Sequence, residues 1–541
     1  MGAAESLGSV RRGLRRIAGA LALGGALCCQ LPTSSSTSAP AVSTPVNTPV
    51  ADVGEPVDRR RCPVDFVRTT PIPQARERVI ARKKKAWERS LGGEAAAKPH
   101  IQARLTGWPR HVLVDRATLP TSDHEWLLRL ARDTWRGLDA LTDRENGLPL
   151  NTVRFARGSV ALADSWIGDY ASCSDIGLHL IAIVAARELG LISDQEANAR
   201  IRRVLDTLAR LETFRGFYFN YYDTTSLERT SNFVSFVDSS WLTAGLIVVR
   251  SAFPEFRERC SALIDRADYD FFYDRASHRL SHGYYTDPGT RSPYDYGMLY
   301  TEARLGSLIA IGKGDVPQEQ WWDMVRTFPA ECGGQTSMPV AARSKRVDAH
   351  EVAGGYYEWQ GMRFVPSWGG SMFEALMPTL LLDEPRYAPK SLGANDRTHA
   401  IVQRRYALQE LGYGAWGISP CAKPQGGYGE YGVRALGAQG YEAGVVTPHA
   451  SALALSVTPE PAIANLRILA QRYDIYGEYG FYDAVDPRDG RVAYSYLALD
   501  QAMLFIAVAN ALNDHCIQKR FEADPVVQRV LPMLAYEDFF D

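Results

Sequence analysis

The stretch DIGLHLIAIVAARELGLISDQEANARIRRVLDTLARL (residues 175–211) decides the fold class. Its first part, Asp175 to Leu189, is apolar on almost every side, which is typical of a helix surrounded by other helices. Gly190 is placed to end that helix, and Ser193-Asp-Gln-Glu196 is a capping box that begins another. The second helix carries a one-sided apolar stripe, formed by Ile201, Val204, Leu205, Leu208 and Leu211. A buried helix followed by a one-sided helix predicts concentric rings of helices.

The same alternation continues over residues 119–541. Further helices are predicted at residues 122–138, 238–250, 300–311, 371–382, 458–473 and 495–512. The loops between them are long and rich in Gly, Tyr and Trp, and one hairpin is predicted around Phe271 to Tyr285. The sequence therefore predicts one large all-α domain rather than three small domains.

Composition limits the class of function. The chain has 541 residues, with 60 Lys plus Arg against 62 Asp plus Glu, so the formal net charge is -2. This balance lacks the basic surface of a nucleic-acid-binding protein, and we expect no nucleic-acid partner. The 11 Trp and 26 Tyr suit stacking on sugar rings, although composition alone favours core filling as their explanation.

The first 60 residues are predicted to be a targeting region. Residues 1–30 combine four arginines with the apolar run Ile17 to Leu27, which is typical of an export signal or lipoprotein leader. Cys28 and Cys29 are candidate lipid attachment sites for a membrane anchor, but Leu27 replaces the small residue expected before the modified cysteine. The alternative is an uncleaved apolar segment. Residues 31–60 are rich in Pro, Ser and Thr and predict an extended tether.

Residues 61–118 are predicted to be an N-terminal extension packed on the main domain. The basic stretch Ala75 to Leu91 reads as an amphipathic helix, which packs on the domain or touches an anionic envelope surface. The eight cysteines form no disulfide framework and no zinc spacing. His278 and His282 have no third ligand nearby, so no metal and no cofactor are predicted.

Eight motifs occur in a characteristic order along the chain. They are TFRGFYFNYYDTTSLE (213–228), FVDSSWLTAGL (236–246), YTEARLGSLIAIGKGD (300–315), SWGGSMFEALMP (367–378), WGIS (416–419), VVTPHASALALSVTPE (445–460), YGFYDAVDP (479–487) and YLALDQAML (496–504). Together they resemble the bacterial endo-β-1,2-glucanases and the related glycoamylase-like module of cyclic β-1,2-glucan synthases. The chain also resembles an uncharacterised bacterial domain family of the same shape. The resemblance implies an (α/α)6 barrel with a sugar-binding cleft at one end.

Cleavage of a glycosidic bond needs two carboxyl groups, one protonated and one charged. Glu302 lies at the start of an apolar helix beside Tyr300, where partial burial would raise its pKa and keep it protonated. The resemblance implies that Glu302 is the general acid. The alternative is a structural ion pair between Glu302 and Arg304.

Asp500 is the candidate general base. It is an acidic residue inside the apolar motif YLALDQAML, so it must meet a partner or water. The resemblance implies that this Asp is the base of an inverting reaction, whereas helix capping or a salt bridge is the alternative. The synthase modules that act as transglycosylases carry an acidic residue just after WGIS, where this chain has Pro420 and Cys421. Hydrolysis with inversion is therefore favoured over a retaining mechanism.

Further residues are candidates for contacts with the sugar. Asp238 either caps a helix or binds sugar, because Asp is a favoured residue at a helix N-terminus. Weaker acidic candidates are Asp175, Glu374, Glu430 and Asp483. Candidate stacking platforms, at least half of which are expected in the core, are Trp166, Tyr222, Trp241, Tyr300, Trp368, Trp416, Tyr428 and Tyr482.

These observations predict an exported, monomeric, inverting glycoside hydrolase that acts on β-1,2-glucan or a related envelope glycan. The main alternative is a tethered glycan-binding protein without catalysis. A third hypothesis, an envelope assembly factor, depends only on the basic stretch Ala75 to Leu91.

Overall fold

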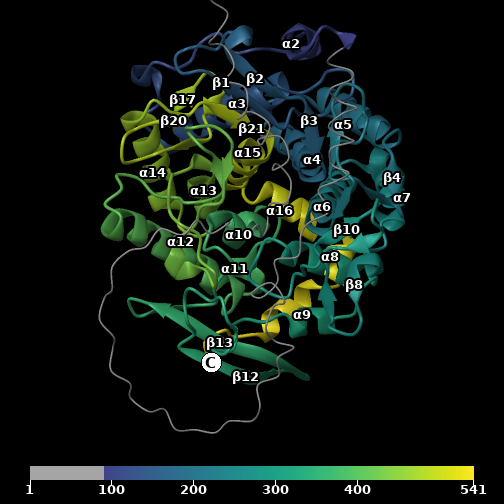
Figure 1. Cartoon of the computed structure of the whole chain (residues 1–541), viewed down its shortest axis with the longest axis vertical. Coiled ribbons are helices and arrows are strands. Elements are labelled where there is room, and N and C mark those ends of the chain that lie inside the picture. Colours follow the sequence, from purple (N-terminus) through teal and green to yellow (C-terminus); the bar gives the residue numbers. More distant parts are fainter. Residues whose placement is uncertain (1–89) are drawn as a thin grey trace, which may run out of the picture. The chain divides into compact units, whose positions relative to one another are not determined.

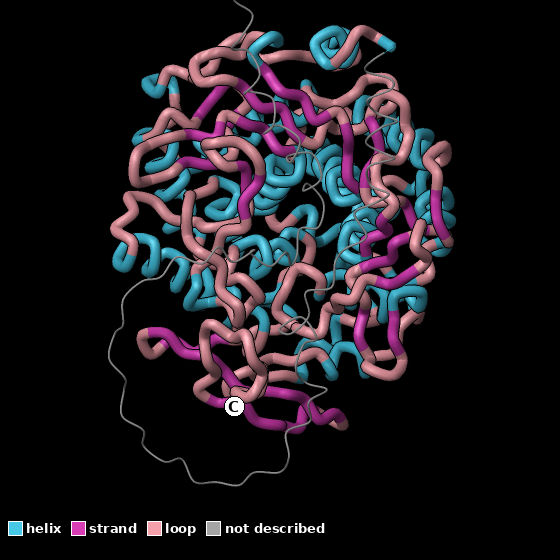
Figure 2. Tube along the Cα trace, in the orientation of Figure 1, coloured by secondary structure: helices cyan, strands magenta, loops and turns pink. Residues whose placement is uncertain are grey.

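The computed structural model describes residues 90–541. The predicted export signal, the tether, Cys28, Cys29 and nearly all of the stretch Ala75 to Leu91 lie outside the described residues. In the described part, helices predominate and strands are short (Figure 2). The prediction of a mostly helical domain is therefore confirmed.

Six of the helices are buried on almost every side, and the others are one-sided or short. The α-helices are α2 (Glu94–Ala103), α3 (Asp123–Ala140), α4 (Cys173–Glu188), α5 (Asp194–Leu208), α6 (Phe236–Ala252), α7 (Arg257–Arg266), α8 (Arg304–Lys313), α9 (Glu319–Asp323), α10 (Met372–Leu376), α11 (Glu384–Tyr387), α12 (Leu392–Arg405), α13 (Pro448–Leu453), α14 (Pro459–Arg472), α15 (Ala498–Leu512), α16 (Cys516–Glu522) and α17 (Pro525–Gln528). No helix in residues 90–541 has the length and apolar character needed to cross a membrane.

The six buried helices are α4, α6, α8, α10, α13 and α15, and each contacts the next (Figure 1). Helix α4 packs against α6 and α15, α6 against α8, and α13 against α10 and α15. The approach of α4 to α6 is close, because a Cβ on Gly177 would lie 2.3 Å from the carbonyl oxygen of Trp241. Arg304 links α8 to α10 by donating to the carbonyl oxygens of Glu374 (3.2 Å) and Ala375 (2.7 Å). The contacts therefore connect the six helices in a closed circular order.

A second set of helices packs on the outside of these six. Helix α5 contacts α4, α7 contacts α6, α17 contacts α8, α12 contacts α10, α14 contacts α13 and α3 contacts α15. The stripe predicted for α5 is buried, since Ile201, Val204 and Leu208 are fully inaccessible. The predicted alternation of inner and outer helices is confirmed for this pair.

Two predicted helices start or end differently. The helix predicted at residues 300–311 begins only at Arg304, so residues 300–303 form an irregular turn before α8. The helix predicted at residues 371–382 breaks after Leu376 into a 3-10 turn, η7 (Met377–Leu380). Pro378 accounts for this break, because proline cannot donate the hydrogen bond that continues an α-helix.

The strands form nine small sheets of two or three strands among the described residues. They are β1 (Thr152–Phe155), β2 (Ser165–Gly168), β3 (Tyr170–Ser172), β4 (Thr213–Phe214), β5 (Phe217–Tyr218), β6 (Tyr221–Asp223), β7 (Phe233–Ser235), β8 (Tyr273–Asp274), β9 (Arg279–Leu280), β10 (Gly283–Tyr285), β11 (Thr290–Arg291), β12 (Ala341–Val347), β13 (His350–Trp359), β14 (Met362–Phe364), β15 (Cys421–Ala422), β16 (Tyr428–Gly429), β17 (Tyr476–Gly477), β18 (Gly480–Phe481), β19 (Ala484–Val485), β20 (Val492–Ala493) and β21 (Ser495–Leu497). Strands β3, β7 and β21 lead directly into α4, α6 and α15.

The prediction of a single hairpin is wrong. The hairpin predicted around Phe271 to Tyr285 is present, since β8 pairs with β9, but the longest hairpin is β12 with β13 (Figure 1). Most residues of β12 are exposed, so buried and exposed residues do not alternate along this strand. Without that alternation, the pattern that identifies a half-buried strand is missing.

Candidate active site

A carboxyl group occupies the third position of four inner helices. The residues are Asp175 in α4, Asp238 in α6, Glu374 in α10 and Asp500 in α15. In α4, α6 and α10 a serine caps the helix by accepting a hydrogen bond from the backbone N–H of this acidic residue. Helix α15 begins after Leu497, which has no capping hydroxyl. Asp500 is thus the one of these four acids that is not explained by a capping serine.

The N-terminal ends of the inner helices lie at the same end of the bundle. His449 is the second residue of α13, and its Nδ1 lies 3.4 Å from Oδ2 of Asp500 near the start of α15. The charge of Asp175 in α4 also acts on Asp500. At the other side, a Cβ on Gly306 near the start of α8 would lie 2.7 Å from the ring of Phe236 at the start of α6. Ser174 near the start of α4 donates to Asp238 near the start of α6 at 2.8 Å, which connects the two sides. The first turns of α13, α15, α4, α6 and α8 therefore lie at a shared end.

Asp483 and Asp500 form a closely spaced carboxyl pair. Asp483 lies between β18 and β19, and Ala422 donates its backbone N–H to Asp483 Oδ2 at 2.5 Å. Ligand atoms of His449, Asp483 and Asp500 all lie within 4.8 Å of one another, and each residue is at most 2% exposed. Two carboxylates and an imidazole are chemically able to hold a divalent cation. The sequence did not predict such a grouping, because the three residues are far apart along the chain.

The protonation of this pair differs from that of ordinary carboxyl groups. Burial raises the pKa of Asp483 to about 6, and burial together with the neighbouring Asp483 charge raises the pKa of Asp500 well above its usual value. Burial also lowers the pKa of His449 to about 3, so its imidazole is neutral. In residues 90–541 no lysine or arginine makes an ion pair with either carboxylate. The pair therefore retains a proton near neutral pH.

Glu302 lies in the turn before α8 and is 1% exposed. Arg304, two residues later, donates from Nε and Nη2 to both carboxylate oxygens of Glu384, at 2.8 and 2.7 Å. The Tyr300 hydroxyl donates to Asp396 Oδ1 at 2.6 Å. Buried bonds therefore fix the turn on both sides of Glu302, and the ion pair of Arg304 is made with Glu384.

The other acidic candidates have different surroundings. Asp238 is partly exposed and accepts a hydrogen bond from Ser174 Oγ at 2.8 Å. Asp175 is 2% exposed and accepts one from Asn151 Nδ2 at 2.9 Å. Glu430 is partly exposed. Asp238 and Glu430 are therefore accessible to a ligand, whereas Asp175 is held in the interior.

Glu374 organises the loop before α10. Its carboxylate accepts hydrogen bonds from Ser367 Oγ (2.8 Å) and from the backbone N–H of Gly369 (3.0 Å). Gly370 in this loop has φ +77°, a conformation that glycine adopts without strain. The contacts of Glu374 thus hold the turn that also contains Trp368.

The aromatic candidates divide into interior and accessible rings. Five of them are at most 3% exposed, which leaves no ring face for a sugar: Tyr222, Trp241, Tyr300, Trp416 and Tyr482. Trp368 is 9% exposed. Trp166 and Tyr428 are partly exposed and stay candidates for stacking.

Sequence reasoning missed other partly exposed tyrosines. Tyr170 and Tyr221 lie on the paired strands β3 and β6, with ring centroids 5.5 Å apart, next to the start of α4. Tyr285 and Tyr294 are partly exposed on and after β10. Tyr170 stands two residues before the capping serine of α4, and that spacing was the available signal in the sequence.

Cys421 occupies the place after WGIS where the synthase modules carry an acidic residue. Its thiol is buried, and burial together with the charges of Asp483 and Asp500 raises its pKa well above the usual value. The thiol is therefore neutral and cannot act as a nucleophile in place of the missing carboxylate.

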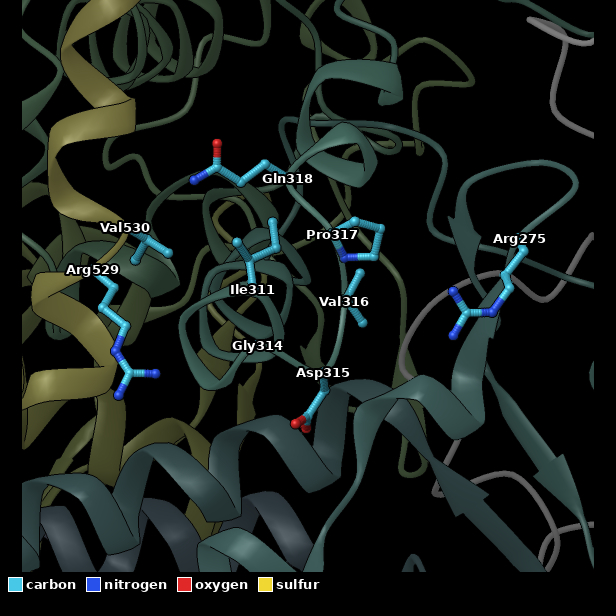
Figure 3. Close-up of a pocket in the computed structure, with 9 residues that line it drawn as sticks. All are labelled: Arg275, Ile311, Gly314, Asp315, Val316, Pro317, Gln318, Arg529 and Val530. Atoms are coloured by element: carbon cyan, nitrogen blue, oxygen red, sulfur yellow. The ribbon is translucent and has the colours of Figure 1, made fainter.

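A separate hollow of about 530 Å³ lies at the other end of α8 (Figure 3). Ile311, Gly314 and Asp315 line it, with Arg529 on the opposite side. Helix α8 has ten residues, so this hollow is about 15 Å along the helix from the turn that carries Glu302. It is not part of the acidic site.

Comparisons with known proteins show which families this chain resembles. The glycoamylase family model ("Putative glucoamylase") matches residues 334–525, and a family of unknown function, DUF3131, matches residues 129–280. The cyclic β-(1,2)-glucan synthase NdvB of Rhizobium meliloti is 24% identical over 556 residues, which cover 75% of this chain and 18% of that protein. The exo β-1,2-glucooligosaccharide sophorohydrolase (non-reducing end) of Parabacteroides distasonis is 21% identical over 77% of this chain and 58% of its own length.

The solved structures support the same relationship at the level of the fold. The endo-β-1,2-glucanase from Chitinophaga pinensis, in complex with sophorotriose and glucose, superposes with a TM-score of 0.61 at 18% identity. The match covers 77% of this chain and 99% of that chain. This chain spans less than two thirds of the length of the two curated relatives above. The family resemblance predicted from the sequence is confirmed: the chain matches the glycoamylase family model, is similar to the cyclic β-(1,2)-glucan synthase and has the fold of an endo-β-1,2-glucanase.

Proposed function

We propose that this chain is a glycoside hydrolase that cleaves β-1,2-glucan or a related envelope glycan with inversion, at one end of an (α/α)6 barrel. The closed circular order of α4, α6, α8, α10, α13 and α15 supports the barrel. The names of the relatives support the substrate, since the sophorohydrolase acts on β-1,2-glucooligosaccharides and the synthase makes cyclic β-(1,2)-glucan.

One observation carries the proposal. In the circular order α8 is third and α15 is sixth, so the two helices face each other across the ring. Glu302 lies just before α8 and Asp500 lies in the first turn of α15, at the same end of the bundle. Two carboxyl groups on opposite sides of one end are what general acid and general base catalysis require.

The roles follow from this placement. Glu302 donates a proton to the glycosidic oxygen as the bond breaks, and the Asp500 side of the site removes a proton from the attacking water. Asp238 and Glu430 accept hydrogen bonds from sugar hydroxyls, and the rings of Trp166 and Tyr428 stack on sugar faces. The protein acts as a monomer in this proposal.

The experiment is to incubate the purified full chain with linear β-1,2-glucan and with β-1,3-, β-1,4- and α-1,4-glucans, and to follow the anomeric protons by NMR. We expect turnover of the β-1,2-glucan and an inverted first product. Glu302→Gln should lower kcat by about 10²- to 10⁴-fold while affinity for the glycan is kept. Asp486→Asn is the matched control, because Asp486 pairs with Arg488 outside the site.

Two results would contradict the proposal. If the folded wild-type protein turns over no glycan in the panel, the remaining hypothesis is a glycan-binding protein without catalysis. Retention of the anomeric configuration would remove the inverting mechanism and would require a carboxylate nucleophile.

We also propose that the protein is exported and lipid-anchored. The predicted signal at residues 1–30 supports export, and so does Cys332, which is disulfide-bonded, because disulfides persist in oxidising compartments. Cell fractionation with palmitate labelling of the wild type and of Cys28→Ser and Cys29→Ser variants tests this. Labelling that survives in both single variants and in their combination would exclude an anchor at these residues.

A further inference from the structure

We propose that Asp483 and Asp500 work as one carboxyl pair that shares a single proton, and that Asp483 takes up this proton when Asp500 accepts one from the attacking water. Asp483 is then a positioning residue that acts through Asp500. This inference rests on the proposed hydrolase function and adds a residue for which sequence analysis predicted only a contact with sugar.

The hydrogen bonds around the pair are asymmetric. Asp483 Oδ2 accepts the backbone N–H of Ala422, which stabilises negative charge on Asp483. In the described part of the chain, neither carboxylate oxygen of Asp500 accepts a hydrogen bond from an N–H donor or a hydroxyl group. Asp483 therefore carries most of the negative charge of the pair. Asp500 carries most of the proton and donates it in a hydrogen bond to Asp483.

No positively charged group in the described part of the chain neutralises the pair. The titratable groups that face it come from four elements: Asp175 (α4), Cys421 (β15), Tyr428 (β16) and His449 (α13). The Thr447 hydroxyl donates to the carbonyl oxygen of Asp483 at 2.6 Å, so its oxygen accepts from Nδ1 of His449, at 2.8 Å. The imidazole is thus a neutral donor in this network. Two adjacent buried carboxyl groups without a counter-charge cannot both ionise, as in the paired carboxyl groups of aspartic proteases.

The proton inventory of the step balances. One O–H bond of the attacking water breaks, and a proton reaches the free oxygen of Asp500, either directly or through a sugar hydroxyl that relays it. The proton already between the two carboxyl groups moves to Asp483, so the pair changes from one negative charge to neutral. The water oxygen bonds to the anomeric carbon, the glycosidic bond breaks, and Glu302 gives its proton to the leaving oxygen. Solvent then returns a proton from the pair to Glu302.

The first test is kinetic and uses the full chain. Asp483→Asn keeps a side-chain carbonyl that can accept the Ala422 N–H, but the amide cannot take up a proton. We expect kcat on β-1,2-glucan to fall about 100-fold with KM within about threefold of the wild type, and Asp483→Glu to recover at least about tenfold of this loss. Asp486→Asn, a buried aspartate of the adjacent hairpin, should leave kcat unchanged.

A double variant separates a shared function from a structural one. If the two residues act as one unit, Asp483→Asn combined with Asp500→Asn should be no slower than Asp500→Asn alone, within about threefold. The proposal would be overturned if the loss of kcat in the double variant equalled the product of the losses in the two single variants. It would also be overturned if kcat of Asp483→Asn stayed within about threefold of the wild type.

A second measurement does not need turnover. Infrared difference spectra at pH 7 separate this proton from those of other protonated carboxyl groups such as Glu302. We expect the difference spectra of Asp483→Asn and of Asp500→Asn against the wild type each to show loss or displacement of one carboxyl C=O band, whereas that of Asp486→Asn should show no such change. A C=O band that is unchanged in Asp483→Asn would mean that Asp500 holds the proton alone, which contradicts sharing. If the band behaves as expected but no glycan is cleaved, the hydrolase proposal fails while the pair stands.

The third test addresses a cation at the same residues. The His449, Asp483 and Asp500 ligand set would accept a divalent ion, which would replace the shared proton. We expect activity and the infrared band to be unchanged by EDTA and by added Ca²⁺, Mg²⁺ or Mn²⁺. Loss of activity with EDTA that one of these ions restores would overturn proton sharing.

Discussion

Two buried clusters of carboxyl groups in this molecule have similar burial, but among the described residues only the first contains a cation. Glu384 and Asp396 surround Arg304, which binds Glu384 with two hydrogen bonds and has its guanidinium 3.7 Å from Asp396. Near Asp483 and Asp500, the one basic side chain found among residues 90–541 is the neutral imidazole of His449. All of these carboxyl groups are at most 2% exposed.

The difference teaches that burial alone does not identify a functional carboxylate. In the first cluster the guanidinium compensates the charge of Glu384, while burial and the Glu384 charge raise the pKa of Asp396 well above its usual value. This cluster holds the turn that carries Glu302. In the second cluster the missing counter-charge makes a carboxyl group retain its proton, which reduces stability near neutral pH. Sites that chemistry needs are often unfavourable for the fold in this way, because perturbed pKa values gather where a reaction uses them.

The largest expected effect is loss of the compensating cation. Arg304→Met should lower the free energy of unfolding by about 3–5 kcal/mol, because Glu384 and Asp396 would stay buried without a partner. Denaturant unfolding measures this. Arg116→Met is the control, since Arg116 pairs with Asp474 through side chains that are 45% and 58% exposed, and its loss should change stability by less than about 1 kcal/mol. Equal losses in the two variants would mean that burial of the ion pair does not matter.

The second prediction concerns stability against pH. The folded pKa of Asp483 is raised from 3.8 to about 6, so the folded state binds the proton more tightly than the unfolded state. This contribution is fully present below pH 3.8 and is lost as the pH rises through about 6. We expect the wild type to lose on the order of 3 kcal/mol relative to Asp483→Asn between pH 4 and pH 7. Denaturant unfolding of both proteins at fixed pH values measures the difference.

The control for this pH experiment is Asp486, whose contribution to stability changes with pH in the opposite direction. The hydrogen bond from Arg488 lowers the pKa of Asp486, so its contribution is present above the ordinary pKa and is lost as the pH falls. Asp486→Asn should therefore leave the decline between pH 4 and pH 7 in place. If stability changes with pH in the same way in the wild type and in Asp483→Asn, then the pKa of Asp483 is not raised in the folded protein.

The third prediction is the acid limb of the rate profile. Because the pair must hold one negative charge to remove a proton from water, kcat/KM should fall about tenfold per pH unit below pH of about 6. Initial rates on β-1,2-glucan between pH 4 and pH 8 measure it. An acid limb near pH 4, the range of an ordinary carboxyl group, would place the base outside this pair.

The smallest effect is expected at the accessible aromatic rings. Trp166 lies on β2, which pairs with β1, and β1 also pairs with β21 directly before α15. Trp166→Ala should raise KM about tenfold, with little change in stability, because a partly exposed ring is removed. Trp359→Ala, at the partly exposed end of β13, is the matched control and should leave KM unchanged. A similar KM for both variants would exclude Trp166 from the sugar site.

Much of the helical framework could be predicted from sequence. The burial of α4 and the one-sided stripe of α5 follow from apolar spacing, which depends only on the helical period. The capping boxes also explain two of the acids. Ser172 and Ser371 lie three residues before Asp175 and Glu374, so that each acid is the partner of its serine in a capping box. The same spacing leaves Asp500 without a cap.

Residue spacing and motifs are enough to predict a mostly helical chain, the family resemblance and acids at the beginnings of apolar helices. Which of these acids meet depends on how the helices and hairpins pack together. Asp483 and Asp500 are brought together across a hairpin and a helix, whereas Arg304 reaches Glu384 across 80 positions of the chain. The physical reason is that local spacing sets a residue's position on its own helix, but a pKa depends on charges and burial supplied by other elements.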